Sequence, residues 1–168
     1  AREAGKSEPW STNFDIFVTP ADGSAAPRNL TRSNPAWDAT PVFSADGRTL
    51  YYRAMKRPGF EADRFGLMAI GVDGSNAHEI APGWDRSADN IRVSADGKRL
   101  YSTAPELGQH PLFAIDIASG KATRIAAEGT ISAFDLRGDS LVFVRDSLKS
   151  PGVLYSARAD GSAVRKLS

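Results

Sequence analysis

The stretch Phe43-Ser44-Ala45-Asp46-Gly47-Arg48-Thr49-Leu50-Tyr51-Tyr52 recurs in this chain as Val93-Ser94-Ala95-Asp96-Gly97-Lys98-Arg99-Leu100-Tyr101-Ser102, 50 residues further on. In both copies an apolar run ends, Asp-Gly follows, and a second apolar run begins. Asp-Gly between two such runs is the strongest short-range signal for a β-hairpin. Each copy therefore predicts a hairpin, and the repeat predicts a chain built from similar units.

A second pattern occurs four times: an apolar strand, a turn containing glycine, and another short strand. The glycines of these turns are Gly23, Gly74, Gly120 and Gly161. One hairpin of each kind makes a unit of four short strands that repeats every 41 to 51 residues. Four-stranded units of about 40–50 residues are typical of β-propeller blades.

The predicted fold is all-β, a partial β-propeller of about three and a half four-stranded antiparallel blades. Propellers generally close their ring with about four to eight blades, so we expect this chain to be a piece of a larger propeller. The expected divisions are a leading segment at 1–14 and a propeller at 15–168, made of a half blade at 15–33 and blades at 34–83, 84–127 and 128–168. Strands are expected near 15–19, 28–31, 41–44, 49–54, 66–71, 77–81, 90–94, 99–103, 111–116, 121–125, 130–135, 140–145, 152–157 and 164–167.

Composition excludes several classes of partner and site. The 168 residues are 41% hydrophobic, which is enough for a core, and 21 basic against 20 acidic residues leave a net charge of +1. Such a balance provides no electrostatic footprint for nucleic acid or an anionic membrane. Without cysteine there is no disulfide framework and no thiolate metal ligand. No apolar run approaches the ~20 residues of a membrane span.

Catalytic signatures are missing from the sequence. It contains no Gly-x-Ser-x-Gly elbow, and no His, Asp and Glu cluster has the spacing of metal ligands. The only histidines are His78, in a predicted outer strand, and His110, in a predicted loop, and both are expected to be partly exposed polar residues. We predict no catalytic residue, no metal and no cofactor within this chain.

The alternating directions of the strands sort the loops onto two sides. The Asp-Gly turns fall on one side, and the second-to-third strand connections and blade-to-blade linkers fall on the other, which we call the loop side. The loop side includes the insertion 55–65, with Glu61-Ala62-Asp63-Arg64, the linker 84–89 and the loop of His110. Binding residues are concentrated on loops held by a rigid scaffold. The loop side is therefore the candidate functional side.

Two interpretations of the Glu61 to Arg64 segment stand side by side. It is either a solvated turn in which Arg64 pairs with its neighbours, or a site where a carboxylate meets the cationic amino terminus of a peptide. A charge-assisted hydrogen bond of that kind in a sheltered cleft contributes roughly 1.5–3 kcal/mol. That is enough to select peptides with a free amino terminus.

The repeated Phe-Ser-x-Asp-Gly-x-x-Leu-x-Tyr pattern resembles the propeller of the prolyl oligopeptidase family of serine peptidases, and also the related TolB-type propellers. The strings at 55–64, 84–87 and 108–113 resemble the bacterial dipeptidyl-peptidase and acylaminoacyl-peptidase branch of that family. The resemblance covers nearly all of 15–168. The hairpin pattern is shared by many propellers, whereas the Glu-Ala-Asp-Arg loop is much more specific.

The resemblance implies a seven- or eight-bladed propeller that caps an α/β-hydrolase domain holding the Ser-Asp-His triad, with the peptide substrate between them. That domain is absent from this chain. The resemblance also implies that Glu61 contacts the peptide amino terminus and that neighbouring residues shape the loop or line the same face. The implied substrate-binding residues are Glu61, Asp63, Arg64, Trp84, Asp85 and Arg86. For a bacterial parent we expect a periplasmic or secreted location rather than a cytoplasmic one.

The main alternative is a non-enzymatic TolB-like propeller that uses the loop side to bind a protein or peptide. A Gly-x-Ser-x-Gly segment elsewhere in the parent polypeptide would separate the two interpretations. In either case an open propeller leaves its terminal blades with an unpaired flank, and exposed sheet surface favours association. We therefore expect the isolated fragment to self-associate.

Overall fold

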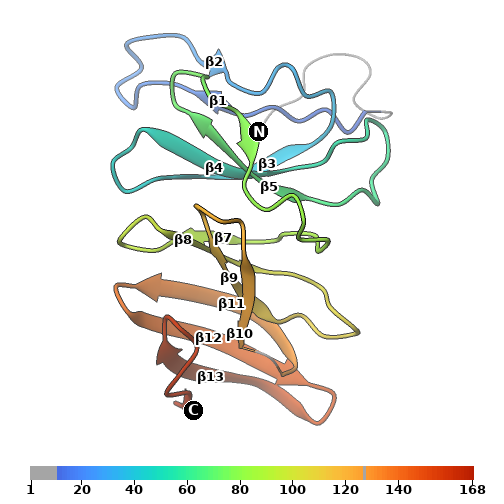
Figure 1. Cartoon of the computed structure of the whole chain (residues 1–168), viewed down its shortest axis with the longest axis vertical. Coiled ribbons are helices and arrows are strands. Elements are labelled where there is room, and N and C mark those ends of the chain that lie inside the picture. The colour runs from blue at the N-terminus through green and yellow to red at the C-terminus, as the bar shows by residue number, and fades with distance from the viewer. Residues whose placement is uncertain (1–10, 127) are drawn as a thin grey trace.

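The computed structural model describes residues 11–126 and 128–168. In this part of the chain there are fourteen strands and no helix, grouped into one two-stranded sheet and three four-stranded sheets. Figure 1 shows the sheets stacked one after another along the long axis of the molecule, in sequence order. Residues 1–10 of the expected leading segment lie outside the described residues.

All pairings within the sheets are antiparallel between consecutive strands. Each strand begins and ends within three residues of the range expected from the sequence. The fold class, an all-β partial propeller of about three and a half blades, is confirmed. The strands are β1 (Phe17–Val18), β2 (Arg28–Asn29), β3 (Asp38–Phe43), β4 (Thr49–Ala54), β5 (Gly66–Gly71), β6 (His78–Glu79), β7 (Ile91–Val93), β8 (Arg99–Thr103), β9 (Leu112–Asp116), β10 (Ala122–Ala126), β11 (Thr130–Arg137), β12 (Ser140–Ser147), β13 (Ser150–Arg158) and β14 (Arg165–Lys166).

The first repeated stretch forms the turn between β3 and β4. Gly47 donates its N–H to the Ser44 carbonyl at 2.9 Å, and the Asp46 side chain accepts from the Arg48 N–H at 3.1 Å. Gly47 has φ +69°, a left-handed conformation that glycine adopts without steric cost. The second stretch makes the same bonds between β7 and β8. The Asp-Gly spacing is therefore a requirement of turn geometry.

In the second strand of each blade, neighbouring side chains point to opposite faces of the sheet and pack into two different hydrophobic clusters. Leu50 of β4 packs toward the half blade, whereas Tyr51 shares a buried cluster with Leu100 of the next blade. One blade later, Tyr101 of β8 shares a cluster with Leu141 of β12. Successive residues of a strand point to opposite faces of its sheet. The sheets that lie between two others are thus covered on both faces by their neighbours.

Adjacent blades are also linked by a repeated backbone hydrogen bond on the loop side. The N–H groups of Asp38, Ala88 and Ile131 donate to the carbonyls of Phe14, Phe65 and His110 at 2.8, 2.9 and 2.9 Å. Each acceptor comes shortly before the third strand of its blade, or before β1 in the half blade, and each donor lies in the inner strand of the next blade or, for Ala88, in the linker just before it. This link brings the linkers and the second-to-third strand loops together.

The loops fall on the two sides that strand alternation predicts. In Figure 1 the Asp-Gly turns lie at the left, and the connections β4–β5, β8–β9 and β12–β13 lie at the right. In the described part of the chain, no helix has the length and apolar character needed to cross a membrane.

Candidate functional site

The insertion between β4 and β5 is folded around the carboxylate of Asp63. Oδ2 of Asp63 accepts the backbone N–H groups of Lys56 and Arg57, both at 2.8 Å, and Oδ1 accepts from Nε of Arg57 at 2.9 Å. A further bond joins the N–H of Gly59 to Oγ1 of Thr12 at 2.9 Å. These bonds close a loop that has no regular strand of its own.

The bonds that close the loop also stabilise the negative charge of Asp63. Its side chain is only 10% exposed. Burial raises the pKa of Asp63, but the hydrogen bonds from the backbone of Lys56 and Arg57 and from the Arg57 side chain outweigh it and hold the pKa at about 2. A carboxylate that accepts several N–H bonds is stabilised in its charged form. Asp63 therefore shapes the loop and stays ionised across the physiological pH range.

Glu61 lies at the outside of the same loop. Its side chain is exposed, and its carboxylate forms no ion pair with the described residues. The ring of Phe60, beside it, is covered by the Arg57 guanidinium at 4.1 Å from the ring centre. The loop thus exposes the carboxylate of Glu61 to solvent, while the carboxylate of Asp63 holds the loop closed.

Arg64 connects the end of the loop to the following linker. Nη2 of Arg64 donates to Glu79 at 2.6 Å, and Nη1 donates to the carbonyl of Trp84 at 3.1 Å. Lys56 reaches the other oxygen of Glu79 at 2.6 Å. Burial raises the pKa of Glu79, but hydrogen bonds from Lys56 and Arg64 outweigh it and lower the pKa below its ordinary value. These contacts connect the two ends of the insertion to Glu79 and to the start of the linker 84–89.

The other predicted residues of the linker have separate roles. The Trp84 ring packs edge-on against Phe113 with 5.2 Å between the ring centres. Asp85 is exposed and pairs with Arg86, which also donates to Glu106 at 3.2 Å. In the described part no hydrogen bond or ion pair joins Glu61 to Trp84, Asp85 or Arg86. The structure therefore joins Arg64 to Trp84 by a hydrogen bond, and among the described residues Glu61 makes no polar contact with either.

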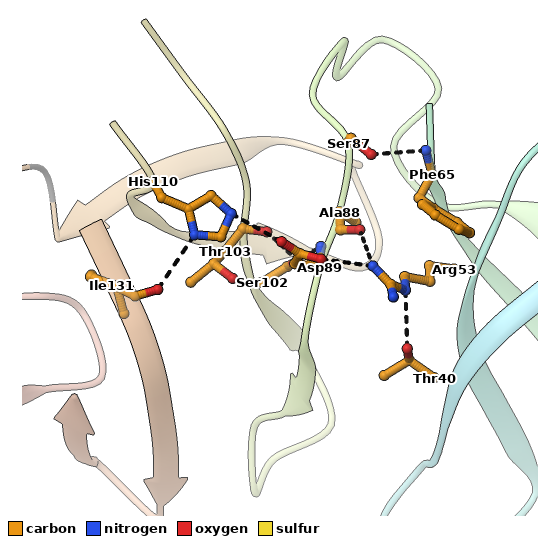
Figure 2. Close-up of polar contacts among 10 residues, drawn as sticks. All are labelled: Thr40, Arg53, Phe65, Ser87, Ala88, Asp89, Ser102, Thr103, His110 and Ile131. Carbon is orange, nitrogen blue, oxygen red and sulfur yellow. Dashed lines mark hydrogen bonds and ion pairs between the residues drawn. The ribbon is translucent and has the colours of Figure 1, made fainter. Parts of the chain in front are cut away.

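A second polar cluster crosses the blades on the loop side (Figure 2). Nη1 of Arg53, in β4, donates to Oδ1 of Asp89 at 2.8 Å and to the carbonyl of Ala88 at 3.1 Å. Oδ2 of Asp89 lies 3.0 Å from Nε2 of His110, in the β8–β9 loop. Nδ1 of His110 lies 3.4 Å from the carbonyl of Ile131 in β11. One line of contacts therefore runs through three blades.

The Arg53 end of this line is held from several directions. Nε of Arg53 donates to Oγ1 of Thr40 at 3.0 Å, and the guanidinium lies 4.4 Å from the centre of the Phe65 ring. From the sequence, His110 is expected to be a partly exposed polar residue, but its pairing with Asp89 is not predicted. The usable signal was Arg53 itself, the one charged residue in the strand Thr49–Ala54. Its pairing with Asp89 links residues 36 positions apart.

Among the described residues no group of three or more His, Cys, Asp or Glu side chains is placed to hold a metal ion. The polar groups of the loop side are instead arranged as ion pairs and exposed carboxylates. Such groups can bind charged or hydrogen-bonding parts of a ligand. The fold and these loops define a class: a β-propeller portion with a polar loop side.

Comparison with known proteins shows which sequences this chain is similar to. No protein-family model matches the sequence. A dipeptidyl-peptidase 5 from Arthroderma otae is 32% identical over 171 residues, which cover 93% of this chain and 23% of that protein. A dipeptidyl-peptidase 5 from Porphyromonas gingivalis is 25% identical over 168 residues, covering 99% of this chain and 24% of the relative. The chain spans about a quarter of the length of these curated relatives.

Solved structures show the same fold. An acylaminoacyl peptidase from Pyrococcus horikoshii superimposes with a TM-score of 0.69 at 19% identity, over 92% of this chain and 22% of that one. TolB from Acinetobacter baumannii gives 0.68 at 17% identity, over 92% and 37%. The chain has the fold of these propellers and resembles the propeller portion of a prolyl oligopeptidase-family peptidase, with sequence similarity to the corresponding quarter of the dipeptidyl-peptidase 5 sequences.

Proposed function

We propose that this chain serves, within a longer serine exopeptidase of the dipeptidyl- or acylaminoacyl-peptidase type, to gate access to the active site and to bind the peptide amino terminus. The similarity to dipeptidyl-peptidase 5 over 93% of the chain supports the peptidase. The proposal needs an α/β-hydrolase domain elsewhere in the parent to supply the catalytic triad. The peptide substrate and that domain are the proposed partners.

The observation that carries the binding role is the exposed carboxylate of Glu61 on a loop that is closed by the hydrogen bonds of Asp63. Asp63 binds the backbone at the start of the loop, which constrains the backbone that carries Glu61. A preorganised carboxylate loses little entropy when it meets a cationic amino group. Arg64, Trp84, Asp85 and Arg86 form the proposed surroundings of the same site.

The test is the substitution Glu61→Gln in the full-length parent. It removes the negative charge and keeps the size, so the Michaelis constant for peptides with a free amino terminus should rise by about tenfold or more. Peptides with a blocked amino terminus should be cleaved as before. The control Asp22→Asn removes an exposed carboxylate from the opposite, Asp-Gly turn side. Unchanged kinetics for free peptides in the Glu61→Gln enzyme would refute the assignment.

A non-enzymatic TolB-like role is the second candidate, supported by the superposition on TolB. It predicts binding of a peptide or protein to the loop side without hydrolysis. A parent polypeptide that contains a Gly-x-Ser-x-Gly segment and cleaves peptides would exclude it. We further propose that the isolated chain self-associates through the uncovered face of its last sheet.

A further inference from the structure

Both ring nitrogens of His110 face hydrogen-bond acceptors. Nε2 lies 3.0 Å from the Asp89 carboxylate, and Nδ1 lies 3.4 Å from the carbonyl oxygen of Ile131. An ionised carboxylate and a backbone carbonyl only accept, and a neutral imidazole carries a single N–H. Only the doubly protonated ring donates to both partners at once (Figure 2). Its positive charge then also meets the negative charge of Asp89.

The charged groups around the ring leave Asp89 as the acid that faces it. The other oxygen of Asp89 is already held by Arg53, from β4. Glu106, on the loop of His110 itself, accepts from Arg86 at 3.2 Å and from Arg124 at 2.9 Å. The negative charge of Glu106 is therefore balanced by its own two cations.

The third blade contributes the sheet behind the ring. In β12, Asp146 pairs in register with Thr130, and Arg145 pairs with Ile131. The Arg145 guanidinium lies 4.3 Å from the centre of the Tyr155 ring. Among the described groups of this sheet, the one within hydrogen-bond reach of the imidazole is therefore the Ile131 carbonyl.

The repeated geometry shows that a histidine is not required for packing at this position. Phe14 and Phe65 make the same backbone link to the following blade that His110 makes, with N–H···O distances of 2.8 and 2.9 Å against 2.9 Å. Two of the three equivalent positions thus carry a plain aromatic ring. The third carries an ionisable ring next to a carboxylate.

We propose that Arg53, Asp89 and His110 form a tie across three blades that strengthens in mildly acidic solution, when His110 takes up its second ring proton. Histidine ordinarily exchanges that proton between about pH 5 and 8. The side chains of His110 and Asp89 are 24% and 43% exposed. Water therefore screens the pair, and the expected effect on stability is a few-fold change in the unfolding equilibrium constant.

The test compares the whole chain with His110→Phe in urea unfolding at pH 5.5 and pH 8.0. Relative to wild type, His110→Phe should raise the unfolding equilibrium constant about two- to fivefold at pH 5.5 and less than twofold at pH 8.0. His110→Gln keeps a side-chain donor without the charge, so at pH 5.5 it should resemble His110→Phe. A Gln variant as stable as wild type at pH 5.5 would overturn the proposal.

A double-mutant cycle with Asp89→Asn locates the partner. The coupling between positions 89 and 110 should be larger at pH 5.5 than at pH 8.0. Equal coupling at the two pH values, or none, would contradict the tie. If Asp89→Asn does not fold because Arg53 loses its counter-charge, the comparison of wild type, Phe and Gln at position 110 decides alone. Neither experiment involves a peptide, so its outcome is independent of the role proposed for Glu61.

Discussion

Asp38, the first residue of β3, is a carboxyl group with no exposed surface. Oδ1 accepts from Nδ2 of Asn34 at 2.9 Å, and Oδ2 has no hydrogen-bond partner among the described residues. Burial raises the pKa of Asp38 from its ordinary 3.8 to about 6, although hydrogen bonds from Asn34 and Thr31 act in the opposite direction. Folding therefore makes the Asp38 carboxyl group easier to protonate than it is in the unfolded chain.

The raised pKa of Asp38 makes the stability of the chain depend on pH. Because the folded pKa lies above the unfolded one, its contribution is fully present below about pH 4 and is lost as pH rises through about 6. Well above pH 6, the ionised Asp38 side chain lowers the free energy of unfolding by roughly 3 kcal/mol. Asp38→Asn should abolish most of this fall and be more stable than wild type at pH 8, as measured by urea unfolding between pH 4.5 and 8.

An exposed aspartate provides the control for Asp38. Asp46, in the β3–β4 turn, has its pKa lowered by hydrogen bonds from Ser44 and from the Arg48 backbone. Its titration therefore lies below the pH range of the experiment, and Asp46→Asn should leave the fall between pH 4.5 and 8 in place. If Asp38→Asn shows the same fall as wild type, a different group is responsible for it.

At the scale of the elements, glycine turns fit between neighbouring blades. Gly120, between β9 and β10, approaches the previous blade so closely that a Cβ would lie 2.5 Å from the carbonyl oxygen of Ile80. Gly161, between β13 and β14, meets Ile125 in the same way, at 2.2 Å. The spacing of the second repeated pattern therefore reflects contact between blades as well as turn geometry.

Gly120→Ala and Gly97→Ala separate these two requirements. Both glycines have φ +69°, but no atom lies within 4 Å of a Cβ at Gly97. Gly97→Ala should lower the unfolding free energy by only about 1 kcal/mol, from the left-handed backbone alone. Gly120→Ala should cost about 2 kcal/mol more, because backbone must move. Equal losses in urea unfolding would show that the contact with Ile80 does not limit the packing of the blades.

The insertion 55–65 differs from the solvated-turn interpretation in one respect. In the solvated-turn interpretation Arg64 pairs with its neighbours, but its guanidinium pairs with Glu79 of β6 and with the Trp84 carbonyl. Asp63, by contrast, pairs within the loop, with Arg57. The loop is therefore ordered by its own carboxylate and by the blade that carries it, and the ligand role of Glu61 stays a proposal.

At the scale of the whole molecule, the last sheet has one face that no other sheet covers within residues 11–126 and 128–168. Leu50, Leu100 and Leu141 face the preceding blade. The next residues Tyr51 and Tyr101 face the following blade, whereas Val142 has none to face in the described part of the chain. Tyr101 is buried there at 1% exposure, whereas Val142 is 39% exposed. Val144 and Leu154 pair beside it on the same sheet. Exposed apolar sheet surface of this kind favours association.

We expect the isolated chain to pair with a second copy through this face. Light scattering coupled to size exclusion should show a mass above that of one 18.0 kDa chain, rising with concentration. Val142→Asp should shift the population to the monomer, because a charge buried between apolar faces is costly. The control Leu148→Ser removes an equally apolar side chain from an exposed turn. A monomer at every concentration would rule out this pairing.

Much of the architecture could be predicted because turns and strand alternation are local. The Asp-Gly turns, the strand ranges and the two sides of the propeller follow from residues close together in the chain. The blade divisions at residues 34, 84 and 128 stay a prediction, although each lies in a linker between two sheets. The line from Arg53 to Ile131 could not be predicted in this way, since its members come from separate blades.

The repeat alone determined that this chain is a stack of antiparallel four-stranded sheets, because hairpin geometry and the two-residue alternation of strands are written in short segments. Only the tertiary structure decided which polar side chains meet. Asp63 holds its loop, Asp38 is buried with its own Oδ2 unsatisfied by the described residues, and His110 reaches Asp89. Those outcomes depend on how loops and sheets fold against one another in space, and the spacing of residues along the chain does not specify that.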